Sequence, residues 1–296
     1  MFNKFIIVTD LTGDTPWLFE CTKRLMAYGA EKCLMIQYEN IDEVIRYSRL
    51  QSDTLLKKSE EIFAAYKNSL LENGFEVKTR VVAGSPTIEI NDIAVSEEYS
   101  LIVVGAGKLS SEGEIYFSSL ANDLMHVVTK PFMIMRPRKT DTIKEDNTLI
   151  INGCEVADHI LCPTDFSNNA DIAFRKVLEI APGKAKKVTL LHVQDSSKIS
   201  PHLEDRLEDF NNLDIARLEG MKKILLDKGN IEADVVVKYG SPALEIIKAV
   251  DELDAQLVIM GSQGRGYIEE FFLGSVSANV ARNASCSVLL IPTKKQ

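Results

Sequence analysis

The sequence predicts an α/β protein that contains two tandem, doubly wound domains. Three observations predict this fold class: an internal repeat, short apolar runs that do not alternate with polar residues, and helical patterns between these runs. Residues 80–105 align without gaps on residues 236–261, and both segments contain Gly-Ser-Pro, Glu-Ile and a final Gly. In the same register, the apolar run that ends at Asp10 matches the run that ends at Asp165. The chain therefore holds two copies of one domain.

Each copy alternates strand-like and helix-like segments in the order β-α-β-α-β-α-β-α-β. The run from Gln256 to Met260 is apolar almost throughout, which is typical of a parallel strand that helices cover on both faces. Parallel neighbours need helical crossovers, so the pattern predicts a doubly wound sheet. In the second copy we expect strands near 159–163, 187–193, 233–238, 256–260 and 287–291, and helices near 168–181, 204–228, 242–252 and 274–283.

The two copies define the expected domain limits. We expect the first domain at 1–140, a linker at 141–157 and the second domain at 158–296. The stretch 138–148 is polar and charged with a single apolar residue, as in a solvated linker, whereas 149–151 has the composition of a short strand.

Composition and charge exclude several function classes. The chain has 296 residues with 34 basic and 43 acidic side chains, so its formal charge of −9 disfavours nucleic acid and anionic lipid as partners. Its five cysteines form no CxxC pair, which indicates reduced thiols and a cytoplasmic location. No apolar run reaches the length of a membrane span. We therefore expect a cytoplasmic protein that binds neither nucleic acid nor a membrane.

The loop after the fourth strand of the second copy is the candidate site. Gly261 and Gly264 expose backbone amides, and Gly274-Ser275 opens the next helix, where unsatisfied N–H groups favour an anion. This pattern predicts a phosphate chain, and the alternative is that the glycines only serve tight turns. The sequence contains neither GxxxxGK[ST] nor GxGxxG, so neither a Walker NTPase nor a dinucleotide dehydrogenase is supported.

The motif Gly261-x2-Gly264-x9-Gly274-Ser275, followed by an apolar strand that ends at Pro292, resembles the nucleotide-binding signature of the universal stress protein family. The similarity extends to both copies. It implies an adenine nucleotide alpha hydrolase-like sheet of five parallel strands per copy, in the order 3-2-1-4-5. It also implies that ATP, ADP or AMP binds between the loops after the first and fourth strands, with Mg²⁺ or Mn²⁺ accompanying ATP and no metal-ligand cluster in the protein.

The resemblance assigns a role to residues of three segments. The adenosine contacts map onto the end of the first strand, the adenine edge onto the second strand, and the ribose and phosphate contacts onto the glycine loop. In that order the residues are Pro163, Thr164 and Asp165; Val193; and Gly261, Ser262, Gln263, Gly264, Arg265, Gly274, Ser275, Val276 and Ser277.

Three of these residues have an alternative role. Asp165 accepts hydrogen bonds only, so it suits a hydroxyl or amine, but it is also placed to cap the helix near Asn168. Ser275 suits a phosphate oxygen or a helix cap, and Arg265 suits phosphate or solvent.

The first copy departs from the signature. Lys108, Ser118 and Ser119 stand where the second copy has Gly264, Gly274 and Ser275, and only Gly105 of the glycines is kept. We expect this site to be weak or empty. The residues left for a second, weak site are Thr9, Asp10, Gly105 and Gly107. The alternative is a different anion nest built from Gly107, Ser110, Ser111 and Gly113, to which Lys108 adds charge.

The leading expectation is a stress-response or regulatory protein that holds an adenine nucleotide in its second copy. No Ser/His/Asp set or catalytic carboxylate pair stands out, so we expect weak ATP hydrolysis at most. One alternative is a slow ATPase or phosphotransferase that uses Ser262, Ser275 or Lys108, and another is an interaction module without nucleotide. The apolar last strands, 132–136 and 287–291, are expected to pack the two domains as a pseudo-dimer, and a further homodimer is an open possibility.

Overall fold

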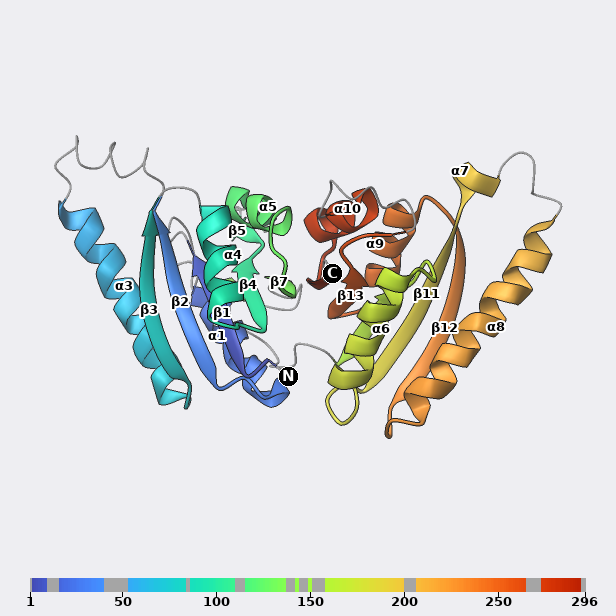
Figure 1. Cartoon of the computed structure of the whole chain (residues 1–296), viewed down its shortest axis with the longest axis horizontal. Helices are drawn as coiled ribbons and strands as arrows, with labels where there is room; N and C mark the ends of the chain where they lie inside the picture. Colours follow the sequence, from blue (N-terminus) through green and yellow to red (C-terminus); the bar gives the residue numbers. More distant parts are fainter. Residues whose placement is uncertain are drawn as a thin grey trace. The chain divides into compact units, whose positions relative to one another are not determined.

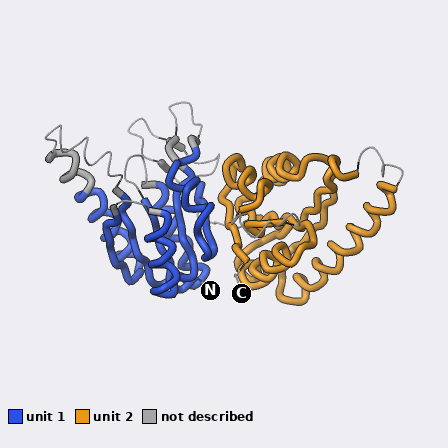
Figure 2. The backbone as a smooth tube through the Cα atoms, turned by 45° about the horizontal axis from the view of Figure 1, so that its top comes forward, with its two compact units in different colours: residues 1–154 blue, residues 155–296 orange. Residues whose placement is uncertain are grey.

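The computed structural model describes residues 2–9, 16–39, 53–83, 86–109, 115–136, 142–143, 149–150, 158–199, 206–264 and 273–293. The chain forms two compact units, residues 1–154 and 155–296 (Figure 2). Most of the segment expected as a linker lies outside the described residues. Its described parts are the strands β8 (Thr142–Ile143) and β9 (Leu149–Ile150), which pair antiparallel, so the short strand expected at this point is present.

Unit 2 contains one parallel sheet in the hydrogen-bonded order β12-β11-β10-β13-β14, which is the order 3-2-1-4-5 along the chain. Its elements are β10 (His159–Pro163), α6 (Asn168–Ile180), β11 (Lys187–Asp195), α7 (Ser196–Ile199), α8 (Leu207–Leu226), β12 (Glu232–Gly240), α9 (Pro242–Glu252), β13 (Leu257–Gly261), α10 (Ser275–Asn283) and β14 (Ser287–Ile291). The sequence predicted all of them except the single turn α7.

Apolar patterning explains the layers of unit 2. Every residue of β13 and β14 is buried, as expected for strands that helices cover on both faces. Helix α6 buries Ala170, Ala173, Phe174, Val177 and Ile180, whose spacing of three and four residues forms one helical face. Helix α6 packs on β10, β13 and β14, whereas α9 packs on α10, β11 and β12. Because βαβ crossovers are right-handed, α6 and α9 cover opposite faces of the sheet.

Unit 1 repeats this topology in the order β7-β4-β1-β2-β3. In both units the long helix, α3 or α8, runs beside the third strand of its own sheet, β3 or β12 (Figure 1). The elements of unit 1 are β1 (Lys4–Thr9), α1 (Pro16–Lys23), the 3₁₀ helix η1 (Arg24–Tyr28), β2 (Lys32–Glu39), α3 (Asp53–Glu72), β3 (Glu76–Ala83), α4 (Pro86–Ser96), β4 (Leu101–Gly105), β5 (Gly107–Leu109), β6 (Ile115–Phe117), α5 (Ser119–Met125) and β7 (Phe132–Met135).

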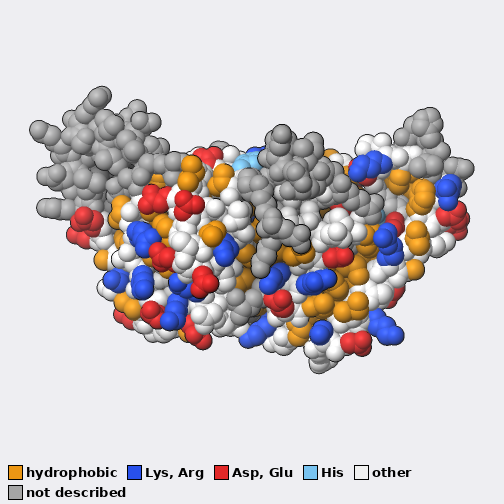
Figure 3. Space-filling view, in the orientation of Figure 1, with side chains coloured by type: hydrophobic (Ala, Val, Ile, Leu, Met, Phe, Trp, Pro, Cys, Tyr) orange, Lys and Arg blue, Asp and Glu red, His pale blue; other side chains and the backbone are white. Residues whose placement is uncertain are grey.

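The surface agrees with the mixed charge of the sequence. On the face drawn in Figure 3, the described Lys and Arg side chains alternate with Asp and Glu side chains instead of forming one basic field. Among the described residues, no helix is both long and apolar enough to cross a membrane. The described cysteines, Cys21, Cys33, Cys162 and Cys286, are buried and form no disulfide with one another.

Candidate functional site

Two loops of unit 2 meet where the sheet changes direction. Strand β10 lies between β11, which follows it in the chain, and β13, so the connections diverge at the carboxyl ends of β10 and β13. Open α/β sheets bind ligands at this switch point. The contact between the loops is close, because a Cβ atom added to Gly264 would lie 2.9 Å from Oδ2 of Asp165. The fold thus joins the Asp165 segment to the glycine loop.

The segment after β10 is a tight turn built by side chains. The Thr164 hydroxyl accepts the N–H of Phe166 at 3.0 Å, and Oδ1 of Asp165 accepts the N–H of Ser167 at 3.0 Å. The Ser167 hydroxyl in turn accepts the N–H of Ala170 at 3.2 Å and is the N-cap of α6. The alternative role of Asp165 as the helix cap is therefore wrong, since Ser167 fills that position and leaves Oδ2 of Asp165 facing Gly264.

The end of β11 presents a backbone edge beside this turn. The ladder between β10 and β11 ends at Pro163 and Leu191, after which the Thr164 N–H still donates to the Leu191 carbonyl at 2.8 Å. Backbone groups of a strand point alternately to its two sides, so the N–H and C=O of Val193 point in the same direction as those of Leu191. They therefore face the region beyond the end of β10, where an adenine edge would pair with them.

The glycine loop after β13 is held by internal hydrogen bonds. The Ser262 N–H donates to the Ile291 carbonyl at 3.0 Å, and the Gly274 N–H donates to the Ser262 carbonyl at 2.7 Å. The Ser277 hydroxyl donates to the Gly261 carbonyl at 2.8 Å. A Cβ on Gly261 would lie 3.0 Å from the backbone oxygen of Asn169.

The loop's glycines thus serve different needs. Gly261 is required by close packing against the backbone of Asn169, a structural need other than the tight turn considered as the alternative. At Gly264 the neighbour is the carboxylate of Asp165, so the missing side chain keeps the loop open toward that turn.

The start of α10 lacks a side-chain cap. Gly274 is the N-cap with φ −76° and ψ 152°, and Ser275 is the first helical residue and exposed, so the alternative role of Ser275 as the cap is wrong. Val276 is half-buried behind it. Close by, the hydroxyl oxygen of Ser262 is buried without a hydrogen-bond partner. A helix N-terminus and an orphaned hydroxyl in one loop are groups that an anionic ligand would satisfy.

Three other predicted residues do not show a free ligand-binding group. The Gln263 side chain is buried, and its Oε1 accepts the Thr293 hydroxyl at 2.8 Å, so this side chain anchors the loop to the end of β14. Arg265 and Asp10 lie outside the described residues, and their predicted roles stay predictions.

The matching loop of unit 1 is built differently. Its residues 107–109 form β5, which pairs antiparallel with β6 so that Gly107 lies opposite Phe117. The Ser118 hydroxyl accepts the Ala121 N–H at 2.9 Å as the N-cap of α5, so this helix has the side-chain cap that α10 lacks.

Close packing also fills the space beside this loop. A Cβ on Gly105 would lie 3.3 Å from the indole of Trp17, which is buried. Thr9 is buried as well.

Other titratable groups have structural surroundings. Burial lowers the pKa of His159, whose Nδ1–H donates to the Leu253 carbonyl at 3.0 Å and whose Nε2 accepts the Thr189 hydroxyl at 2.8 Å. Burial raises the pKa of the Cys162 thiol to about 12, so the thiol stays protonated. In the described part of the chain, no three His, Cys, Asp or Glu side chains gather as a metal site.

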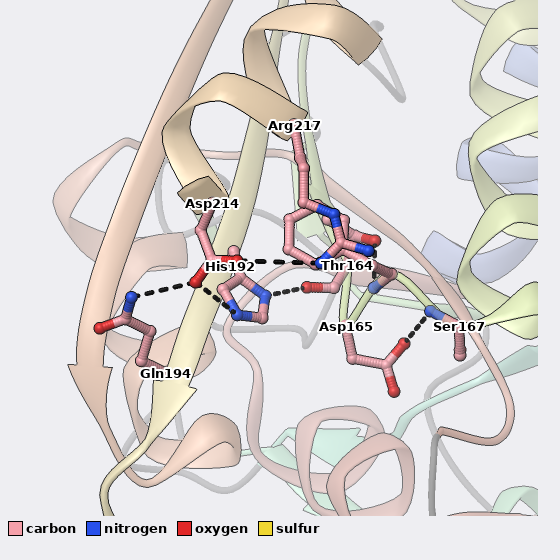
Figure 4. A network of polar contacts seen from close by, with 8 residues as sticks. Thr164, Asp165, Ser167, His192, Gln194, Asp214 and Arg217 are labelled. Atoms are coloured by element: carbon pink, nitrogen blue, oxygen red, sulfur yellow. Dashed lines mark hydrogen bonds and ion pairs between the residues drawn. The ribbon is translucent and has the colours of Figure 1, made fainter. Parts of the chain in front are cut away.

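One group of side chains beside the site was missed from the sequence. His192 lies against the Thr164 carbonyl, and Asp214 and Arg217 of α8 reach the same place (Figure 4). The available signal was the alternation of polar His192 and Gln194 on the apolar strand β11, which puts both on one face.

Comparisons with known proteins agree with this fold. The family model described as "Universal stress protein family" matches residues 27–136 and 157–292. Universal stress protein MJ0577 of Methanocaldococcus jannaschii is 34% identical over 154 residues, which cover 46% of this chain and 94% of that protein. A putative universal stress protein of Staphylococcus saprophyticus is 31% identical over 140 residues, covering 46% of this chain and 84% of that protein.

A solved structure has the same two-domain extent. The universal stress protein from Archaeoglobus fulgidus covers 98% of this chain and 96% of its own with a TM-score of 0.68, and its 22% identity makes this a likeness of fold. Both halves of the chain match the family model, and each unit has the parallel sheet described above. The chain therefore belongs to the universal stress protein family, as a tandem member with two such domains.

Proposed function

We propose that unit 2 binds an adenine nucleotide, ATP, ADP or AMP, between the loops after β10 and β13, and that the chain is a nucleotide-binding stress-response or regulatory protein. The observation that carries this proposal is the contact between Gly264 and Asp165. Because a Cβ on Gly264 would lie only 2.9 Å from the Asp165 carboxylate, the glycine loop and the Asp165 turn lie side by side, so that one ligand can contact both. Family membership supports the same site, because the glycine signature of unit 2 is intact.

The charges fix the direction of the bound nucleotide. The Asp165 carboxylate accepts hydrogen bonds and repels phosphate, so it belongs beside the ribose hydroxyls or the adenosine amine. The uncapped N-terminus of α10 attracts phosphate, and the orphaned hydroxyl of Ser262 supplies a donor there. The adenosine therefore lies toward β10 and β11, with the backbone of Val193 at the adenine edge, and the phosphates lie toward Ser275 and Ser277 of α10.

A divalent metal has a limited place in this proposal. Mg²⁺ or Mn²⁺ would enter with ATP and be held by the phosphate oxygens and water, since these ions prefer oxygen ligands. Arg265 is proposed as a further phosphate contact.

Each chain then carries one nucleotide. The β5–β6 hairpin and the side-chain cap that Ser118 gives to α5 support an empty or weak site in unit 1. We also propose that the two domains pack through their apolar last strands, β7 and β14, and that the protein is cytoplasmic. The composition of those strands supports the first proposal, and the buried cysteine thiols support the second.

Calorimetric titration of the full chain with ATP, ADP, AMP and GTP tests the proposal. We expect one adenine nucleotide per chain and much weaker binding of GTP. Chromatography of the incubated ATP separates the functions, because unchanged ATP supports a regulatory binder and accumulating ADP supports a slow ATPase or phosphotransferase. Binding of none of the four nucleotides contradicts the proposal and favours an interaction module.

A further inference from the structure

Phe166 has a strained backbone at the proposed adenosine end. Its φ is 58°, in the left-handed region, and it directly follows Asp165. Bulky residues rarely adopt this conformation, which persists only where neighbouring groups hold it. The neighbouring groups are visible here. The Phe166 ring lies 4.1 Å from the Arg217 guanidinium carbon and 4.6 Å from the His192 ring, measured between centroids for the rings.

His192 holds the residues on both sides of Asp165. Its Nδ1 lies 2.7 Å from the Thr164 carbonyl oxygen, and because a carbonyl only accepts, Nδ1 carries the proton. Its ring contacts Phe166 on the other side of the turn. The imidazole is buried at the end of β11, so its position is fixed by the sheet. His192 thus positions the Asp165 carboxylate through the two neighbouring residues, Thr164 and Phe166.

A buried carboxylate frames the imidazole and the guanidinium. Oδ2 of Asp214 accepts the Gln194 amide at 3.0 Å and lies 3.6 Å from Nε2 of His192. Its Oδ1 lies 4.0 Å from Arg217. Figure 4 shows these side chains converging from β11 and α8 on the turn after β10. Together with the Thr164 carbonyl, these neighbours leave the buried imidazole little freedom to reorient.

We propose that His192, with Phe166, Asp214 and Arg217, positions the Asp165 turn and thereby sets the affinity of unit 2 for the adenosine part of its ligand. This inference rests on the proposed nucleotide function and adds residues that do not touch the nucleotide. Since the network acts at the adenosine end, its loss weakens adenosine, AMP and ATP by the same factor. A change at the phosphate end would weaken ATP more than adenosine.

Two substitutions of His192 separate its nitrogens. The amide nitrogen of Asn occupies the place of Nδ1, whereas that of Gln reaches the place of Nε2. We expect His192→Asn to keep the bond to the Thr164 carbonyl, to lose only the ring contact with Phe166, and to bind adenosine, AMP and ATP about threefold more weakly than the parent chain. We expect His192→Gln to lose roughly tenfold for all three ligands, the usual effect of one lost hydrogen bond. His159→Gln is the matched control and should leave all three affinities unchanged.

A second variant covers the case in which His192→Gln does not fold. Arg217 is half-exposed on α8, so Arg217→Ala leaves the fold intact and removes one contact of Phe166. We expect a loss of about threefold or more, again equal for the three ligands.

The outcomes are distinct. Equal affinities of His192→Gln and the parent overturn the inference, as does an equal loss in the Asn and Gln variants or a loss confined to ATP. An Arg217→Ala variant that binds like the parent overturns it as well. If the parent chain binds no adenine compound, the proposed function itself is wrong and the inference falls with it.

Discussion

Gly264→Ala is the substitution whose effect the structure defines most sharply. The added Cβ would lie 2.9 Å from Oδ2 of Asp165, so the carboxylate must move by about 0.5 Å or more to reach ordinary contact distance. The atom displaced is the end of a side chain and Gly264 does not have a positive φ, so the fold tolerates the change. The ligand contact of Asp165 does not. Losing a hydrogen bond to a charged group corresponds to about 1.5–3 kcal/mol, or roughly 10- to 100-fold in affinity.

The assay is calorimetric titration of the full chain with ATP, together with thermal unfolding. Gly220→Ala is a matched control, because it makes the same chemical change in the same unit at a helical position where the Cβ meets nothing within 4 Å. The control should bind ATP like the parent and gain about 0.5–1 kcal/mol in stability.

The result that would refute this reasoning is specific. If Gly264→Ala binds ATP as tightly as the parent and Gly220→Ala, then the Asp165 turn does not contact the ligand. If Gly264→Ala loses binding together with several degrees of unfolding temperature, then the glycine serves the fold and not the site.

Three further predictions concern the same unit. Gly261→Ala places a Cβ 3.0 Å from a backbone oxygen, so urea titration should give a free energy of unfolding lower by about 1–3 kcal/mol, and an unchanged value would be inconsistent with the packing. Ser262→Ala removes a buried hydroxyl that has no hydrogen-bond partner, so the ligand-free chain should be as stable as the parent or more stable. Calorimetry should give a roughly 3- to 10-fold weaker affinity of this variant for ATP. Tighter binding would refute the role of Ser262 as a hydrogen-bond donor to the ligand. Folding lowers the pKa of His159 through burial, whereas the pKa in the unfolded chain is about 6.5. The contribution of His159 to stability is therefore full above about pH 6.5 and is lost as the pH falls below that value. His159→Gln should therefore lose less stability than the parent between about pH 7.5 and 5.5, and parallel losses would contradict this assignment.

The fold could be predicted well from the sequence because local patterns of apolar and polar residues specify its strands and helices. Strands such as β14 are continuous apolar runs between polar turns, and because the domain is repeated, the same pattern of strands and helices occurs twice in the chain. The ends of elements depended on turn geometry that no pattern reports. Asp165 was a plausible N-cap for α6. However, Phe166 has a left-handed backbone conformation that adds a turn before the helix, so Ser167 is the N-cap.

The side-chain network was beyond sequence reasoning for a different reason. Asp214 and Arg217 come from a helix well downstream of His192, so only the tertiary fold brings them to the Thr164 carbonyl. The hairpin of unit 1 was missed because β5 and β6 are three residues each, too short to form a recognisable alternation. The Ser262 hydroxyl likewise becomes notable only when its burial and missing partner are seen.

Native mass spectrometry of the full chain with ATP, beside a Gly264→Asp variant, tests the central claim most directly. The substitution puts a second carboxylate against Asp165 and a side chain between the glycine loop and the Asp165 turn. It should therefore abolish binding without unfolding the sheet. The account predicts one ATP per parent chain and none on the folded variant. Two nucleotides per parent chain, or one retained by the variant, would contradict a single site in unit 2.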